Sequence, residues 1–142
     1  MGRLLAIDYG KKRTGIAVSD SLKLIAGGLM TIDTPHLLDF IADYLQKEDV
    51  ERIIVGYPKQ MNGEESENMK RISPFVNRLK KLYPSIPVEL YDERFTSVIA
   101  QRAVIDGGVK KKNRRENKGL IDMVSATIIL EDFMASKQNF TN

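Results

Sequence analysis

Two short runs rich in isoleucine, leucine and valine, residues 3–8 and 14–19, lie on either side of a basic turn. This pattern indicates two antiparallel strands that form a β-hairpin. A third strand is expected at residues 24–33, where the missing side chains of Gly27 and Gly28 suggest a bulge or bend. The chain is therefore predicted to begin as a three-stranded antiparallel meander.

Predicted helices and strands alternate after the meander. The first helix should begin with Thr34 as its N-cap and Pro35 in its first turn. The later elements are expected to be strands at residues 52–56 and 87–91 and helices at residues 69–83, 96–105 and 119–136. Pro74 should kink its helix or mark a restart that Ser73 caps. Because parallel strands need crossover helices, this order predicts an α/β fold, a mixed sheet with helices on its faces.

The chain length of 142 residues is that of one domain, predicted to span residues 1–142, with a flexible basic loop at residues 107–118 and a loose tail at residues 137–142. No apolar run is long enough to cross a bilayer, and the N-terminal apolar stretch is too short for a signal peptide. A cytoplasmic protein without a membrane partner is expected. Since the chain has no cysteine, any bound metal must use oxygen ligands or the single histidine, His36, which favours Mg²⁺ or Mn²⁺.

Three carboxylates are candidates for a common site. Asp8 ends the first predicted strand, Glu93 ends the last, and Asp122 lies in the final helix. Ser125 and Ala126 follow Asp122 by one turn on the same helical face, so this part of the helix could approach the sheet closely. Each acid also has an ordinary interpretation, as a turn residue, a surface ion-pair partner or a helix N-terminal acid. Taken together they point to a metal site, because mutual repulsion between carboxylates favours the binding of a cation.

Two basic segments, residues 11–13 and 110–115, contain eight of the 22 lysine and arginine residues. The net charge of the chain is +3. The two segments suit an anionic partner, although the overall charge is modest for a protein that binds nucleic acid. The candidate phosphate contacts are Lys11, Lys12, Arg13, Lys59 and Arg94 near strand ends and Lys111, Arg114 and Arg115 in the basic loop. Solvated turn charges and a charged loop without a ligand are the alternative interpretations.

Four segments, in order along the chain, are similar to the motifs of one known family. They are Asp-Tyr-Gly-Lys-Lys-Arg-Thr-Gly from residue 8, Gly-Tyr-Pro-Lys with Met-Asn-Gly at residues 56–63, Asp-Glu-Arg-Phe-Thr-Ser at residues 92–97, and Ile-Asp with Ser-Ala at residues 121–126. From Leu4 to about Phe133, the sequence resembles the YqgF family, also called RuvX, whose members are described as Holliday junction resolvases and as pre-16S rRNA nucleases.

The resemblance implies an RNase H-like fold, with a mixed five-stranded sheet akin to that of RuvC resolvases. It also implies that Asp8, Glu93 and Asp122 are catalytic residues that bind one or two Mg²⁺ or Mn²⁺ ions and cleave a phosphodiester bond. RuvC itself has a further acid after its fourth strand, where this chain has Gly-Tyr-Pro-Lys at residues 56–59. A second ion would therefore depend on Glu93 as the substitute for that acid.

The favoured function is that of a metal-dependent endonuclease that processes the 5′ end of precursor 16S rRNA, with RNA as the partner. Cleavage of four-way DNA junctions is the nearest alternative; it normally requires a symmetric dimer, and the sequence leaves open a monomer or a weak homodimer. A non-catalytic RNA-binding ribosome-assembly factor is a further alternative. An ATPase of the sugar kinase, actin and Hsp70 class is not expected, because one domain cannot form its interdomain cleft, so no nucleotide cofactor is predicted.

Overall fold

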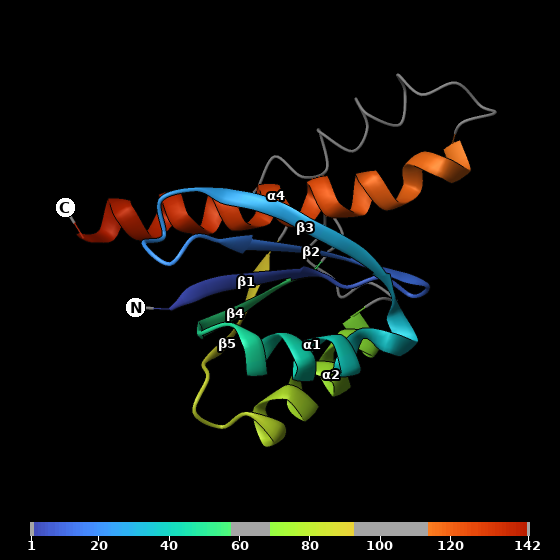
Figure 1. The fold of residues 1–142 in the computed structure, drawn as a ribbon, viewed down its shortest axis with the longest axis horizontal. Coiled ribbons are helices and arrows are strands. Elements are labelled where there is room, and N and C mark those ends of the chain that lie inside the picture. The colour runs from blue at the N-terminus through green and yellow to red at the C-terminus, as the bar shows by residue number, and fades with distance from the viewer. Residues whose placement is uncertain (1, 58–68, 93–113, 142) are drawn as a thin grey trace.

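The computed structural model describes residues 2–57, 69–92 and 114–141, which form a five-stranded mixed sheet with helices on both faces (Figure 1). The strands lie in the order β3-β2-β1-β4-β5. β2 pairs antiparallel with both β1 and β3, whereas β4 pairs parallel with both β1 and β5. The predicted meander followed by parallel strands is confirmed. The strands are β1 (Arg3–Asp8), β2 (Arg13–Ser19), β3 (Ala26–Asp33), β4 (Val50–Tyr57) and β5 (Val88–Asp92).

Helices cover the two faces of the sheet unequally. The helical elements in the described ranges are a 3₁₀ turn η1 (Thr34–His36), α1 (Leu37–Lys47), α2 (Met69–Leu82) and α4 (Arg114–Thr141). Figure 1 shows α4 along one face, with α1 and α2 on the other. Pro74 lies inside α2, which is a single helical element. None of these helices is both long enough and apolar enough to cross a membrane. The helix expected at residues 96–105 falls outside the described residues.

α4 is longer at both ends than the sequence predicts. It begins at Arg114, so residues 114–118, which were expected to belong to a flexible basic loop, are helical. It continues to Thr141, so residues 137–141 of the expected loose tail are helical as well. Arginine, glutamate, lysine and glutamine have high helix propensities, and such residues extend a helix that is already anchored by its packing. Residues 107–113 lie outside the described ranges.

The meander contains the bulge that Gly27 and Gly28 suggest. The register between β2 and β3 shifts between Ile16, which pairs with Met30, and Ala17, which pairs with Gly28. Leu29 is therefore the extra residue of the bulge. An extra residue next to a glycine bends the strand and increases its twist. β3 can therefore curve over α4 at the edge of the sheet.

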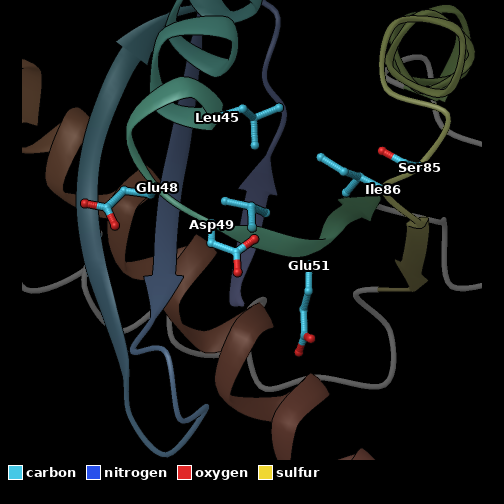
Figure 2. Close-up of a pocket in the computed structure, with 7 residues that line it drawn as sticks. Leu45, Glu48, Asp49, Glu51, Ser85 and Ile86 are labelled. Carbon is cyan, nitrogen blue, oxygen red and sulfur yellow. The ribbon is translucent and has the colours of Figure 1, made fainter. Parts of the chain in front are cut away.

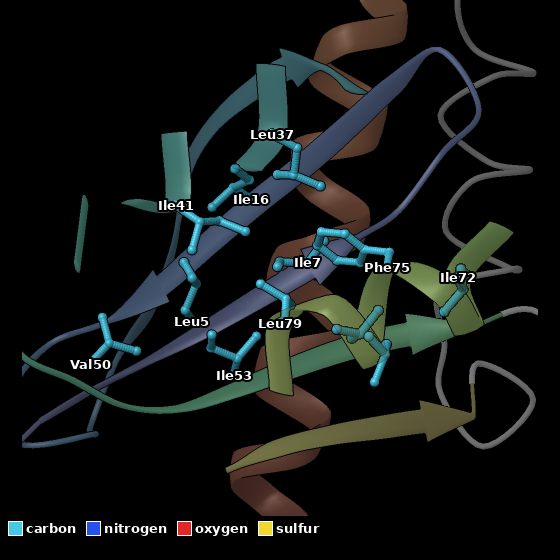
Figure 3. Packing of buried hydrophobic residues seen from close by; sticks show 12 residues of the cluster. Leu5, Ile7, Ile16, Leu37, Ile41, Val50, Ile53, Ile72, Phe75 and Leu79 are labelled. Atoms are coloured by element: carbon cyan, nitrogen blue, oxygen red, sulfur yellow. The ribbon is translucent and has the colours of Figure 1, made fainter. Parts of the chain in front are cut away.

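Two apolar clusters lie on opposite faces of the sheet, because successive residues of a strand point to opposite sides. In β1, Leu5 and Ile7 face α1 and α2, whereas Leu4 and Ala6 face α4. Figure 3 shows the first cluster, in which Leu5 and Ile7 lie among side chains of both helices. The fully buried members of the two clusters include Leu5, Ile7, Ile16, Ile41, Ile53 and Leu79 on one face and Ala6, Ala17, Ile54, Ile129 and Leu130 on the other.

Candidate active site

Asp8 occupies the carboxyl end of β1, on the face that α4 covers. It has the same strand parity as Leu4 and Ala6, and only 6% of its surface is exposed. Asp8 pairs with Gly56 of β4, and Gly56 pairs in turn with Tyr91 of β5. The carboxyl ends of the three parallel strands are therefore aligned at one edge of the sheet, and Asp8 stands in that row.

Gly15 allows α4 to approach this edge of the sheet. It lies directly opposite Asp8 in the antiparallel pair of β1 and β2. A Cβ atom at Gly15 would lie 1.9 Å from the carbonyl oxygen of Asp122 and 2.3 Å from its carbonyl carbon. One turn later, Ser125 and Ala126 are 1% and 0% exposed, which confirms the predicted close approach. Asp8 and Asp122 are thus neighbours of the same glycine.

Arg13 forms an ion pair with the second of these acids. The Arg13 Nε group donates a hydrogen bond of 3.2 Å to Oδ2 of Asp122, across 109 residues of sequence. The two side chains are 36% and 24% exposed. Arg13 has the strand parity of Gly15 and so projects from the face that α4 covers. The guanidinium thereby places a positive charge beside the predicted carboxylate site.

The turn that precedes Arg13 is fixed by Thr34. The Thr34 hydroxyl donates to the carbonyl oxygen of Gly10 at 2.7 Å and lies 3.0 Å from the hydroxyl of Thr14. The Thr34 backbone N–H donates to the carbonyl oxygen of Lys12 at 2.9 Å. Lys11 and Lys12 are both exposed. The two lysines therefore project into solvent from a turn whose backbone is held in place.

The N-cap role predicted for Thr34 is wrong. Thr34 is the first residue of η1, and neither the cap residue of η1, Asp33, nor that of α1, His36, makes a side-chain capping hydrogen bond. The hydroxyl that would cap the helix is used to bind the hairpin turn instead. A local capping signal has been overridden by a tertiary contact.

Several predicted site residues fall outside what the structure describes. Glu93, Lys59, Arg94 and Lys111 belong to the ranges that are not described, and Arg114 and Arg115 are in the first turn of α4, with no description of their side chains. Within the described parts of the chain, no group of three or more acids or histidines lies close enough to hold a metal ion. The described residues contribute two of the three predicted acids, Asp8 and Asp122.

An acidic cavity of about 440 Å³ lies elsewhere on the protein, at the amino end of β4 (Figure 2). Val50 at this end pairs with the start of β1, so the cavity is remote from Asp8. Glu48 pairs with Arg3 at 3.3 Å, and Glu51 pairs with Lys23. Figure 2 shows the Glu48 and Glu51 side chains pointing in different directions. These acids are engaged in surface ion pairs and do not converge on a common point.

Sequence comparison relates the chain to one family over nearly its whole length. The model of the RuvX family, described as Holliday junction resolvase, matches residues 2–136. A protein of Phocaeicola vulgatus named "Putative pre-16S rRNA nuclease" is 64% identical over 138 residues, covering 97% of this chain and 99% of that protein. A Flavobacterium johnsoniae protein of the same name is 51% identical, with the same shares covered.

Solved structures of resolvases share the fold. T. thermophilus RuvC, in complex with a Holliday junction substrate, gives a TM-score of 0.56 at 15% identity, over 95% of this chain and 97% of that one. The Fowlpox virus resolvase, in complex with Holliday junction DNA, gives 0.54 at 18% identity, over 94% and 97%. At such identities the likeness concerns the fold alone, and it confirms the RuvC-like architecture predicted from the sequence.

Proposed function

This chain belongs to the RuvX family, and we propose that it is a metal-dependent endonuclease that processes the 5′ end of precursor 16S rRNA during ribosome biogenesis. Membership confirms the resemblance found in the sequence. The observation that carries the proposal is that Asp8 and Asp122 both adjoin Gly15 at the carboxyl end of β1: Asp8 is its cross-strand partner, and the backbone of Asp122 packs against it. The substrate is proposed from the names of the relatives, and the cytoplasm, where ribosomes are assembled, is the proposed location.

The donor atoms at this edge suit a hard divalent cation. Asp8 and Asp122 offer only carboxylate oxygens, the ligands that Mg²⁺ and Mn²⁺ prefer. We propose Glu93 as the third ligand because it directly follows Asp92, the last residue of β5, at the same edge of the sheet. Two strand spacings of about 4.8 Å separate β1 from β5, a span that two acidic side chains and an ion can bridge. The chemistry supplied by one or two such ions is activation of a water nucleophile and stabilisation of charge on the phosphate.

The basic residues near the acids are the proposed contacts to the RNA backbone. Lys11 and Lys12 are exposed on the fixed turn that follows Asp8, and Arg13 has further N–H donors besides the one that binds Asp122. Charged donors to phosphate oxygens fix the register of a nucleic acid without reading its sequence. The other proposed contacts, by their place in the sequence, are Lys59, Arg94, Lys111, Arg114 and Arg115.

The test of this function compares two substrates. A labelled precursor of 16S rRNA and a four-way DNA junction are incubated with the protein, each with Mg²⁺ and with chelator. Metal-dependent cleavage of the precursor at its 5′ region, with the junction left intact, is the expected result. Precursor cleavage that persists in chelator would remove the proposed mechanism, and binding without cleavage would indicate an assembly factor.

Junction resolution is the second candidate function. The description of the family model and the shared fold with the two resolvases favour it. A resolvase must cut two strands in step, which normally requires a symmetric dimer. Efficient junction cleavage by a dimer in the same assay would select this function over precursor processing.

Arg13 should compete with the metal ion for Asp122. Its guanidinium lies where a cation bound to that carboxylate would be repelled, so we expect Arg13→Gln to bind Mn²⁺ about two- to fivefold more tightly, the effect of removing a partly exposed ion pair. Calorimetric titration measures the affinity directly. Lys47→Gln, which removes an exposed positive charge from the end of α1, is the matched control and should leave the affinity unchanged. Weaker Mn²⁺ binding in Arg13→Gln would show that the arginine supports the site.

A further inference from the structure

A cavity of about 360 Å³ lies beside the hairpin turn, on the face of the sheet opposite α4. Its volume is within the range of about 300–1,000 Å³ found for small-molecule sites. Tyr9, which directly follows Asp8, contributes to its wall, and the ring of Tyr9 packs against the cluster that α1 and α2 cover. Asp8 and Tyr9 are adjacent in the sequence, but the carboxylate of Asp8 and the cavity lie on opposite faces of the sheet.

Aromatic and aliphatic side chains form the floor of the cavity. The rings of Tyr9 and Phe75 have their centroids 4.9 Å apart and are inclined by 34°. Phe75 and Leu37 are 8% and 1% exposed, so both are held by the core, whereas Tyr9 and Leu38 are only partly buried. Figure 3 shows Phe75 beside Ile7 and Leu37 above it in the cluster. A partly exposed ring backed by fixed side chains is a surface on which a flat apolar group can stack.

A positively charged side chain, that of Lys11, lies at the rim of the cavity. Lys11 is exposed and is the only acidic or basic residue among the seven described residues that line the cavity. Thr34, which also lines the cavity, holds the carbonyl oxygens of Gly10 and Lys12 and so fixes the turn that bears Lys11. An apolar floor that contains aromatic rings, with a lysine at its edge, matches a ligand in which an aromatic ring is joined to an anion.

We propose that this cavity binds one unstacked base of a single-stranded RNA, with the phosphate of the same nucleotide held by Lys11. Bases of single strands are recognised by stacking on aromatic side chains, combined with cationic contacts to the backbone. The inference rests on the proposed function, since it places the base next to the end of β1 that bears Asp8, on the opposite face from the carboxylates that would cleave the strand. It also adds to that function, because a base inside a paired duplex cannot enter the cavity.

The experiment uses a short single-stranded RNA with 2-aminopurine at one position, bound in the presence of chelator so that cleavage does not contribute. Fluorescence of 2-aminopurine should fall on binding, because the base stacks on Tyr9. Tyr9→Leu retains an apolar contact to Phe75 but removes the ring; it should weaken binding about tenfold and abolish the fluorescence change. Lys11→Gln, at an exposed position, should weaken binding about three- to tenfold and reduce its salt dependence.

The controls separate this site from the rest of the surface. Lys47→Gln removes an equivalent charge from the far end of α1 and should change the affinity less than about twofold, as surface substitutions usually do. Thermal unfolding confirms that each variant is folded. The same RNA in a duplex should bind without quenching. Equal quenching and affinity in Tyr9→Leu, or equal binding of RNA with an abasic nucleotide at every position, would overturn the proposal.

The outcomes distinguish this inference from the proposed function. Because binding is measured in chelator, base stacking can be observed even if the protein fails to cleave the rRNA precursor. Conversely, cleavage of the precursor at wild-type rate by a folded Tyr9→Leu protein, together with unchanged quenching, would retain the nuclease and remove the base site.

Discussion

Replacement of Asp8 by asparagine should lower the cleavage rate of precursor 16S rRNA by about 10³-fold or more, as the loss of a catalytic group typically does. Asparagine has nearly the same shape as aspartate but lacks the negative charge that would hold a metal ion. Asp8 is 6% exposed at the end of β1, so an isosteric replacement should preserve the packing of the neighbouring strands. Single-turnover cleavage assays measure the rate, and circular dichroism with thermal unfolding verifies the fold.

Asp43→Asn is the matched control for this substitution. Asp43 is exposed on α1 and pairs with Lys47 on the same helix at 3.1 Å, remote from the sheet edge. This variant should cleave at the wild-type rate, since exposed ion pairs contribute little to stability. Undiminished cleavage by Asp8→Asn would contradict the assignment of Asp8 to the catalytic site.

The second large effect is expected at Gly15, where there is no room for a side chain. A methyl group at this position would lie 1.9 Å from a backbone oxygen of α4, so Gly15→Ala must displace either the helix or β2. We expect a loss of about 1–3 kcal/mol or more in the free energy of unfolding, in line with overpacked sites. Because the shifted backbone is that of Asp122, cleavage should fall as well, even in the fraction that remains folded.

Gly27→Ala provides the comparison for Gly15→Ala. Gly27 belongs to β3 of the same sheet, and a Cβ atom there would meet no atom of the described residues within 4 Å. Alanine at this position should change the free energy of unfolding by less than about 1 kcal/mol. Denaturant unfolding of both variants measures the difference. Equal stabilities of the two variants would show that α4 does not depend on Gly15 for its approach to the sheet.

The sequence predicts the framework well because local patterns specify it. The hairpin of β1 and β2, the bulge near Gly28 and the strands β4 and β5 follow from apolar runs, turns and glycines that are close in sequence. The close approach of α4 is also foreseeable, since an isolated glycine inside a strand, here Gly15, is a recognised sign that another backbone lies nearby.

The parts that sequence reasoning missed depend on tertiary contacts. Thr34 has the local features of an N-cap, but its hydroxyl binds the hairpin turn, which is 24 residues away. The pairing of Arg13 with Asp122 joins residues separated by 109 positions, and no local pattern predicts such a partner. The early start of α4 at Arg114 also differs from prediction: the charged residues from Arg114 extend a helix that is anchored by its packing on the sheet, and that anchor is not visible in the local sequence.

The most direct test of the metal site at Asp8 and Asp122 is a crystal structure of the protein soaked with Mn²⁺, in which anomalous scattering locates the ion. We expect an anomalous peak in bonding contact with the carboxylates of both Asp8 and Asp122, with Arg13 moved away from Asp122. Full occupancy of Mn²⁺ at other positions, with Asp122 still paired to Arg13 and cleavage unaffected, would contradict this assignment.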